Sequence, residues 1–395
     1  MMSTGSTTPF VPLKFIAEIV SGGTPKADLD NWNGDIPFIT PPDLNGLDGD
    51  VVSRWERTLT KDGTSGSSIT NDAVLLSCRA PIGHVGVVTS EVAFNQGCKS
   101  IVPQDADDLA YVAYCLVASR RALQALGRGT TFTELSTTEL SNLSIPWPVC
   151  MDRRAITRYL DRETGEIDAM LAKLDELREQ LIQRRLAAFD NEFSCVGTSS
   201  KARLPFVADV IPGLTYSPSD IVDSGGVVVH RAGSVQNSRI DRSDLVRVST
   251  SIPAKLFIQP GDILVCTRNG SAHLVGKCAI VGISEIGETW GAFMTVLRSQ
   301  HYRYIYWYMQ SSLFAQERKQ YFTSTINQLT VGMFSRMMIP FPESHVQERI
   351  ADHLDEVTGR IDAMLANIDE LRALLVERRA ALITDVVTGR KKVPA

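Results

Sequence analysis

Residues that could carry out catalysis are scarce in this chain, and their spacing fits no common catalytic motif. The segment Gly270–Cys278 looks like a phosphate-binding loop, in which four residues separate two glycines and a Lys and a hydroxyl side chain follow. Here five residues separate Gly270 from Gly276, and Cys278 stands where the magnesium-binding hydroxyl belongs. The sequence also lacks a GxSxG nucleophile turn and an HExxH metal motif, and its six histidines lie far apart. We therefore expect no catalytic residue and no metal site.

Two further patterns give the same negative result. The segment Thr40–Asp43 superficially matches the Asn/Asp-Pro-Pro-aromatic motif of adenine methyltransferases, but it has neither the Asn or Asp nor the stacking aromatic residue, so we interpret it as a turn. The seven cysteines are odd in number and show no CxxC spacing, which argues against a disulfide framework and a structural zinc site. A protein without a catalytic centre is most simply a recognition module.

Length and composition describe an ordinary folded chain. Its 395 residues predict two or three domains, and 44% of them are apolar and 22% charged. No window is apolar enough to span a bilayer and the first residues do not resemble a signal peptide, so we expect a cytoplasmic protein without membrane contact. The net charge of −5 counts against nucleic-acid binding, but residues 191–344 carry 14 basic and 11 acidic side chains. Binding requires only such a local patch.

A long segment of the chain is duplicated. Leu160–Arg178 is repeated as Leu354–Arg372, and between residues 160 and 189 the two copies share 18 of 30 positions at an offset of 194. The repeat extends upstream, where Ile145–Pro148 matches Ile339–Pro342. Each half of the chain is therefore one divergent globular part followed by one strongly repeated helix.

The repeated helices carry a heptad pattern that is typical of a coiled coil. Each spans roughly 37 residues, or about 55 Å, which is too long for one small domain to cover, so we expect the two copies to pack antiparallel about a pseudo-twofold axis. Met170 and Met364 flank the seam and are expected to pack in it. The predicted seam residues are Leu160, Ile167, Leu174, Leu181, Leu354, Ile361, Ile368 and Leu375.

The divergent parts contain short β-prone runs bounded by Gly, Pro, Asn and Ser, and each ends in one helical stretch, at residues 109–126 and 302–321. We therefore expect an α+β fold, with two α/β domains related by a pseudo-twofold axis and separated by two long antiparallel helices that form a coiled coil. The expected domains are residues 1–150 and 203–344, the long helices are 151–190 and 345–390, and the linker is 191–202.

These motifs, in this order and duplicated, resemble the specificity subunits of type I restriction-modification systems. The resemblance covers the chain from Val11 to Lys392 and is carried by Phe15–Pro25, Gly34–Thr40, Ser77–Gly83 with Asn95–Gly97, Ile145–Pro148 and the repeated Ile-Asp-Ala-Met-Leu helices. The second half departs from the pattern, because Arg268–Ser271 replaces the Arg-Ala-Pro-Ile-Gly run.

The resemblance implies a non-catalytic protein in which each domain, a target-recognition domain, reads one half of a bipartite, gapped site in double-stranded DNA. It also implies that the long helices dock two methyltransferase subunits that methylate adenine, and that restriction and translocation subunits join through the methyltransferase. S-adenosylmethionine, ATP and Mg²⁺ then belong to those partner subunits, and no cofactor belongs to this chain.

Base readout in the major groove favours Arg for guanine and Asn or Gln for adenine, while Lys, Ser and Thr hold phosphates. Arg79 and Arg268 occupy matching positions after a strand in both copies, where DNA contact and a structural salt bridge both remain open. Gly22 and Gly213 indicate tight turns at matching positions. The candidate DNA-binding residues are Lys26, Thr40, Arg79, His84, Gln96, Lys99, Arg128, Arg231, Gln236, Asn237, Arg268, Asn269, His273 and Lys277.

Two other interpretations remain. One is a coiled-coil scaffold whose two heads bind proteins instead of DNA, which predicts no salt-dependent affinity for DNA. The other is an enzyme with an unrecognised site, such as a fused methyltransferase-nuclease, against which the missing cofactor loop argues.

Overall fold

The chain folds into two compact units. The computed structural model describes residues 8–26, 28–79, 81–127, 134–196, 200–320 and 327–394. The first unit comprises residues 1–174 with 369–395, and the second comprises residues 175–368. Each unit therefore contains one globular domain together with one end of each long helix.

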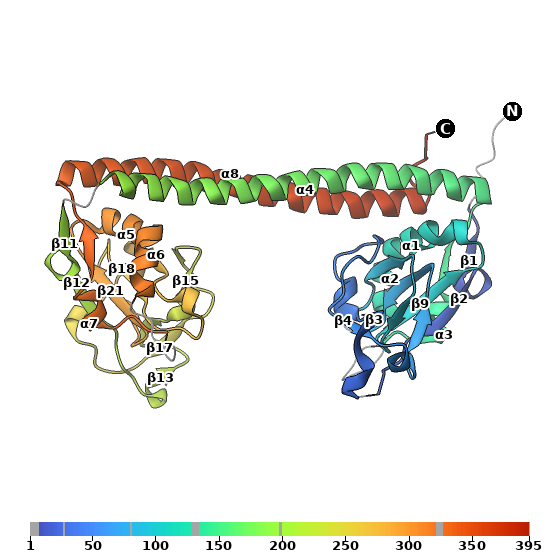
Figure 1. Cartoon of the computed structure of the whole chain (residues 1–395), viewed down its shortest axis with the longest axis horizontal. Coiled ribbons are helices and arrows are strands. Elements are labelled where there is room, and N and C mark those ends of the chain that lie inside the picture. Colours follow the sequence, from blue (N-terminus) through green and yellow to red (C-terminus); the bar gives the residue numbers. More distant parts are fainter. Residues whose placement is uncertain are drawn as a thin grey trace. The chain divides into compact units, whose positions relative to one another are not determined.

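Two four-stranded sheets form the core of the first unit (Figure 1). The antiparallel sheet has the order β2 (Ala17–Ser21), β9 (Cys98–Pro103), β6 (Ala73–Ser77), β7 (Val85–Val88). The mixed sheet has the order β4 (Arg57–Leu59), β3 (Trp32–Ile39), β8 (Val92–Phe94), β5 (Ser68–Thr70), with β3 and β8 parallel. A short antiparallel pair joins β1 (Phe10–Pro12) to β10 (Ser144–Pro146).

Strand β6 is a continuous apolar run because both of its faces are buried. Val74 and Leu76 pack in one core with helix α1 (Leu109–Ala118). The alternate residues, Ala73 and Leu75, pack in a second core with residues of the mixed sheet. The period of two along the strand thus divides its side chains between two layers of the domain.

The second unit repeats this architecture. Its antiparallel sheet has the order β12 (Asp209–Pro212), β21 (Met294–Arg298), β18 (Ile263–Cys266), β19 (Cys278–Ile280). Its mixed sheet has the order β13 (Ile221–Val222), β17 (Val246–Val248), β14 (Val227–His230), β20 (Thr289–Trp290), with β14 and β20 parallel. Two short pairs join β11 (Lys201–Arg203) to β22 (Met338–Pro340) and β15 (Val235–Gln236) to β16 (Arg239–Ile240). The α+β fold predicted for both halves is confirmed.

Each expected helical stretch is divided in two. Ser119 separates α1 from α2 (Arg120–Leu126), and Ser311 separates α5 (Tyr302–Gln310) from α6 (Ser312–Lys319). The side chain of Ser311 accepts a hydrogen bond from Phe314 N and so caps the N-terminus of α6. This cap explains the break, which the continuous apolar pattern of the sequence did not predict. The remaining short helices are α3 (Thr137–Asn142) and α7 (Val331–Phe334).

The two long helices are α4 (Cys150–Cys195) and α8 (Ser344–Val387). In the first unit, Tyr159 and Asp168 of α4 contact Lys391 and Arg379, respectively. In the second unit, Arg185 pairs with Asp362 and Glu192 with Arg349. Within each unit, a higher residue number in α4 therefore pairs with a lower residue number in the C-terminal segment, so the two segments run antiparallel.

Most of the predicted seam lies inside these helix pairs. Leu160, Ile167, Leu181, Leu354, Ile361 and Ile368 are buried, and Leu174 and Leu375 are half-buried. The prediction that Met170 and Met364 pack in the seam is wrong, because these side chains are 54% and 48% exposed. Thr164, four residues after Leu160, is buried instead. The buried face of the helix therefore runs through Leu160, Thr164 and Ile167, and Met170 lies outside it.

The expected linker at 191–202 begins too early. Helix α4 continues to Cys195 because Phe189 and Phe193 pack into the core of the second unit beside Tyr304 and Tyr308. Strand β11 then begins at Lys201, inside the range expected for the linker. Within the described ranges, no helix is both long and apolar enough to cross a membrane.

Candidate nucleic-acid interface

The loops that follow β2, β3, β6 and β8 lie together at one edge of the first unit. The ends of β2 and β6 both pair with the start of β9, and the parallel strands β3 and β8 end side by side. Gly23 N donates to Phe94 O at 3.1 Å, and Thr24 Oγ1 donates to Gln96 Oε1 at 2.8 Å. We call this group the first strand-end cluster and define it as Gly22–Lys26, Thr40, Arg79 and Asn95–Gly97.

The loops of this cluster approach so closely that one position admits only glycine. A Cβ atom on Gly22 would lie 1.9 Å from Asn95 O. The matching glycine of the second unit, Gly213, is held in the same way, since its Cβ would lie 2.1 Å from Gly291 O. No turn is assigned at either glycine, so the tight turns predicted there are not seen, and it is the close backbone approach that fixes the loops of each cluster against each other.

A backbone junction anchors Arg79 within the first cluster. Cys78 N donates to Gly97 O at 2.7 Å, and Leu135 N donates to Cys78 O at 2.9 Å. The backbone of Arg79 forms a β-bridge with Glu134, and the guanidinium pairs with the carboxylate of Glu134 at 3.2 Å. Of the two interpretations left open for Arg79, the structure shows the salt bridge.

Lys99 lies inside the domain, although we expected it at the surface. Its side chain is 5% exposed, and its Nζ donates to Ser21 Oγ at 3.1 Å. Lys99 stands on β9, at the centre of a sheet covered on both faces, which explains its burial. Lys26 is exposed at the rim of the cluster. Arg128, the remaining basic candidate of this unit, lies outside the described residues.

Thr40 and His84 are occupied by local structure. Thr40 Oγ1 donates to Asp43 Oδ2 at 2.5 Å within a capping box that opens a short 3-10 helix. His84 closes the turn after β6, where its backbone N–H donates to Ser77 Oγ at 2.9 Å. Burial lowers the pKa of His84, and the neighbouring Arg120 lowers it further, which favours the neutral imidazole.

The second unit has an equivalent group of loops, the second strand-end cluster, defined as Gly213–Tyr216, Arg231, Arg268 and Gly291–Phe293. Gly213 N donates to Met294 O at 3.1 Å, and Leu214 N donates to Trp290 O at 2.7 Å. These loops line an open pocket of about 620 Å³. Its lining combines apolar and aromatic side chains with an ion pair between Arg231 and Asp244 at 2.7 Å. Tyr216, Phe293 and Asp244 of this lining were not predicted from the sequence.

The backbone junction of the first cluster recurs here with different side chains. Thr267 N and Arg268 N donate to Phe293 O at 2.9 and 3.2 Å, and Thr267 Oγ1 donates to the same carbonyl at 2.9 Å. Leu329 N donates to Thr267 O at 2.8 Å, and Arg268 forms a β-bridge with Gln328. The guanidinium of Arg268 lies over the ring of Phe293, 5.0 Å from its centroid.

Gln236 and Asn237 lie on the β15–β16 hairpin, apart from Arg268. Asn237 and Ser238 have φ of 48° and 60°, the conformation of a tight hairpin turn. Ser238 Oγ donates to Gln310 Oε1 at 3.3 Å, and Arg239 pairs with Asp362 at 3.1 Å. The turn of this hairpin is therefore held against α5 and α8, while Gln236 Nε2 donates to Gly233 O, in the lining of the pocket, at 3.1 Å.

Asn269, His273 and Lys277 share the loop between β18 and β19. Asn269 Oδ1 accepts a hydrogen bond from Ser271 N at 3.1 Å, which makes this asparagine part of a local turn. His273 is exposed and Lys277 is half-buried. Asn269 follows Arg268 directly, so the first of the three lies beside the second cluster.

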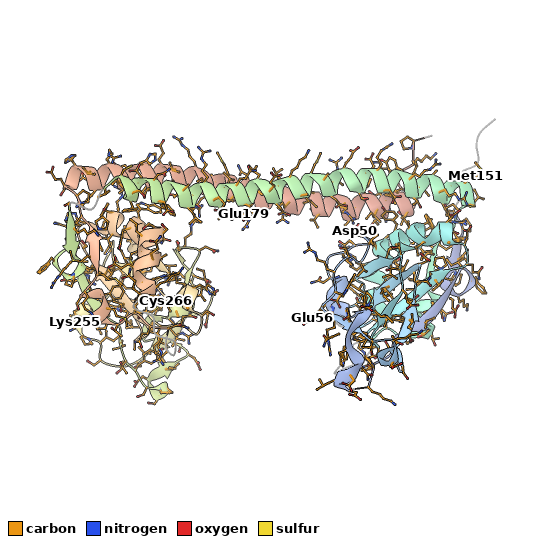
Figure 2. All side chains as sticks on the ribbon, viewed as in Figure 1. Asp50, Glu56, Met151, Glu179, Lys255 and Cys266 are labelled. Carbon is orange, nitrogen blue, oxygen red and sulfur yellow. The ribbon has the colours of Figure 1, made fainter. Side chains whose placement is uncertain are left out.

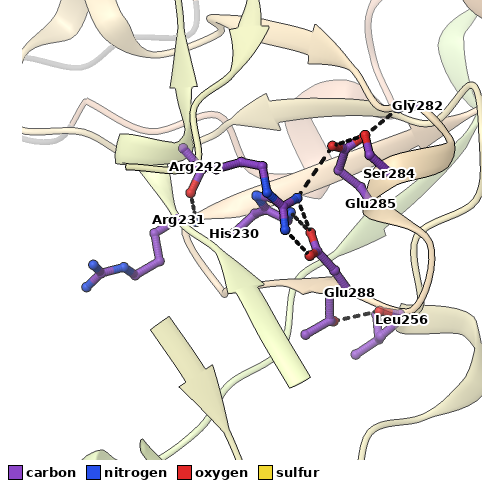
Figure 3. A network of polar contacts seen from close by, with 10 residues as sticks. His230, Arg231, Arg242, Leu256, Gly282, Ser284, Glu285 and Glu288 are labelled. Atoms are coloured by element: carbon purple, nitrogen blue, oxygen red, sulfur yellow. Dashed lines mark hydrogen bonds and ion pairs between the residues drawn. The ribbon is translucent and has the colours of Figure 1, made fainter. Parts of the chain in front are cut away.

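A buried polar network, which the sequence did not reveal, supports Arg231. His230 is fully buried, and its Nε2 lies 2.7 Å from Glu288 Oε2. Arg242 points between Glu288 and Glu285 and donates to both (Figure 3). Burial by itself would raise the pKa of Glu288, but the hydrogen bonds from Arg242 and His230 outweigh it and lower that pKa. The network links β14 to the loop before β20 and so fixes the strand that leads into Arg231.

Metal-ligand groups and reactive thiols are what chemistry other than binding would require. No group of three or more His, Cys, Asp or Glu within the described ranges is arranged to hold a metal ion. Cys266 lies inside the second domain (Figure 2), and burial raises the pKa of its thiol. Burial also raises the pKa of Cys78 to about 12, so neither thiol is a ready nucleophile.

Comparison with known proteins gives the same assignment for both halves. The family "Type I restriction modification DNA specificity domain" matches residues 7–179 and 202–373. The MjaIX specificity subunit of Methanocaldococcus jannaschii is 30% identical over 187 residues, which cover 46% of this chain and 42% of that protein. The StySPI specificity subunit of Salmonella potsdam is 27% identical over 191 residues, 46% of this chain and 41% of that protein. The matched stretches thus span less than half the length of these relatives.

The fold agrees with that of a solved protein over nearly the whole chain. A structure from a study of complex assembly and conformational transition of the type I R-M system aligns with a TM-score of 0.75 and 15% identity, covering 97% of this chain and 98% of the other. At this identity the likeness concerns the fold. Because the family matches both halves of the sequence, the chain belongs to the type I restriction-modification DNA specificity family.

Proposed function

We propose that this chain is the DNA-specificity subunit of a type I restriction-modification complex, in which each target-recognition domain reads one half of a bipartite, gapped site. The observation that carries the proposal is the pair of strand-end clusters. Each domain holds the same backbone junction and the same close glycine contact, yet presents different side chains on them. A common frame with exchangeable side chains is what reading two different half-sites requires.

The chain acts in this proposal without catalytic chemistry of its own. Adenine methylation, with S-adenosylmethionine, belongs to methyltransferase subunits, and ATP and Mg²⁺ serve restriction and translocation subunits that join through them. The proposed substrate is double-stranded DNA, and the complex is proposed to act on it in the cytoplasm.

The long helices are the proposed docking elements for two methyltransferase subunits. Met170 and Leu177 on α4 are 54% and 44% exposed, and Met364 and Leu371, at the matching positions of α8, are 48% and 49% exposed. Large apolar side chains repeated at equivalent exposed positions indicate binding surfaces. Because the two copies match, they favour two identical partners.

The proposal is tested by co-expressing the chain with the methyltransferase subunit encoded beside it and mapping adenine methylation across the host genome. A gapped motif with two specific halves is the expected result. A stable complex that leaves the genome unmethylated would contradict the specificity role and favour the scaffold interpretation.

A further inference from the structure

The two strand-end clusters share a backbone but differ in charge. In the first cluster, the carboxylate of Glu134 neutralises the guanidinium of Arg79 at 3.2 Å. In the second, the residue bridged to Arg268 is Gln328, which carries no charge. Within the described ranges, no Asp or Glu pairs with Arg268, and the residues outside those ranges include no Asp or Glu. Arg268 therefore keeps its full positive charge at an exposed position.

The clusters also differ in the side chain beside the arginine. Gly97 of the first cluster is replaced by Phe293 in the second, and both carbonyls accept the hydrogen bond of the junction. The first cluster has no room for such a ring, because a Cβ on Gly97 would lie 2.8 Å from Pro41 Cγ. Phe293 is 55% exposed, although large aromatic rings are usually buried.

Arg268 and Phe293 form a rigid pair. Three hydrogen bonds from Thr267 and Arg268 hold the carbonyl of Phe293, and the guanidinium stacks on the ring. Stacking leaves the N–H groups at the edge of the guanidinium free to donate, and it limits the orientations that the side chain can adopt. A preorganised arginine fork loses less conformational entropy on binding than a flexible one.

The chemistry of this pair fits one combination of base edges. A guanidinium fork matches the O6 and N7 acceptors of guanine, and the only apolar group on a major-groove edge is the methyl group of thymine. Arg231, the other arginine of the second cluster, is already paired with Asp244 at 2.7 Å. Arg268 is therefore the arginine of this cluster whose donors are uncommitted.

We propose that Arg268 and Phe293 together read a guanine and an adjacent thymine in the half-site of the second domain, and that Arg79 makes no equivalent contact in the first half-site. This inference rests on the proposed function. It assigns Phe293 as a specificity residue and makes the two matching arginines functionally different. Arg268 contacts guanine O6 and N7, and the exposed edge of Phe293 contacts the thymine methyl group.

The test uses the complex of the full chain with its methyltransferase and duplexes that carry the motif found by methylation mapping. In separate duplexes, each guanine of the second half-site is replaced by 7-deazaguanine, which lacks the N7 acceptor, and each thymine by uracil, which lacks the methyl group. Dissociation constants are measured at fixed salt. One 7-deazaguanine is expected to weaken wild-type binding roughly 10-fold, and uracil at a neighbouring thymine to weaken it ~3-fold.

Variants assign these effects to residues. Arg268→Lys keeps the charge but loses the fork, so it should abolish the 7-deazaguanine effect while preserving non-specific binding. Gln328→Glu gives Arg268 the kind of carboxylate partner that Arg79 has in Glu134. This variant should also reduce the 7-deazaguanine effect. Phe293→Ala should abolish the uracil effect. Arg79→Ala is the matched control and should leave every base effect of the second half-site unchanged.

The outcomes separate this inference from the proposed function. If no gapped motif is found, the proposed function fails and this inference fails with it. If the motif is found but its second half contains no guanine, or if 7-deazaguanine weakens wild-type and Arg268→Lys complexes equally, the assignment of Arg268 is overturned while the specificity role stands.

Discussion

The first recognition domain should depend strongly on one buried ion pair at the start of α4. Arg153 Nε and Nη2 each donate a hydrogen bond of 2.7 Å to the carboxylate of Asp108. The side chain of Asp108 is only 3% exposed, and that of Arg153 is 10% exposed. Arg153 also donates to Pro148 O at 2.7 Å and lies over the ring of Trp147. The hydrogen bonds that Arg153 donates to Asp108 raise the pKa of Arg153, so this guanidinium stays charged at any relevant pH.

Asp108→Asn removes one charge and leaves the other buried. Breaking a buried pair in this way costs about 3–5 kcal/mol, because the remaining ion has lost its counter-charge. For a unit of ~200 residues, that cost corresponds to a fall in melting temperature on the order of 10 °C. The second unit has no equivalent ion pair, because Gln347 stands at the position that matches Arg153. The stability of the second unit should therefore not change.

Urea unfolding of the full chain, followed by far-UV circular dichroism, measures this loss. The control is the double variant Asp108→Leu with Arg153→Met, which removes both charges and should recover most of the stability. If Asp108→Asn unfolds within about 0.5 kcal/mol of the wild type, or if the double variant is as unstable as the single one, the reasoning about this pair is refuted.

Three further predictions follow from the clusters, the network and the long helices. Gly22→Ala should displace the loop at Asn95, since its Cβ would lie 1.9 Å from that carbonyl oxygen; weaker DNA binding with an unchanged circular dichroism spectrum is expected, and unchanged binding would contradict it. Ionised Glu288 should stabilise the folded state fully above its ordinary pKa of 4.5, and this stabilisation should be lost as the pH falls through its lowered pKa in the folded state. Urea unfolding at several pH values measures this dependence. Glu288→Gln should remove the part of the stability that is lost in acid. Met170→Ser and Met364→Ser should each weaken methyltransferase binding in calorimetry without lowering the melting temperature, because both side chains are exposed; a normal stoichiometry and affinity would oppose docking at these residues.

The features predicted correctly from the sequence are those that local periodicity determines. The heptads placed Leu160 and Leu354 inside the helix pairs, and β-prone runs of the divergent parts became inner strands such as β18. The duplication predicted two similar folds because both halves carry the same pattern. These signals act over a few residues and need no knowledge of distant contacts.

The positions of the candidate DNA-binding residues depended on partners elsewhere in the chain. Arg79 and Arg268 match in sequence, but whether each guanidinium is neutralised depends on Glu134 or Gln328 in a later loop. Lys99 has the charge of a phosphate contact, yet its strand lies at the centre of a covered sheet. Side-chain type and loop position do not contain this information, because the tertiary fold alone brings those segments together.

A domain exchange tests whether each domain reads its own half of the DNA site. Residues 1–150 are replaced by the corresponding domain of another family member, the chimera is co-expressed with the methyltransferase, and genomic adenine methylation is mapped. We predict a gapped motif in which one half changes and the other half stays as in the wild type. A motif that changes in both halves, or in neither, would contradict the account.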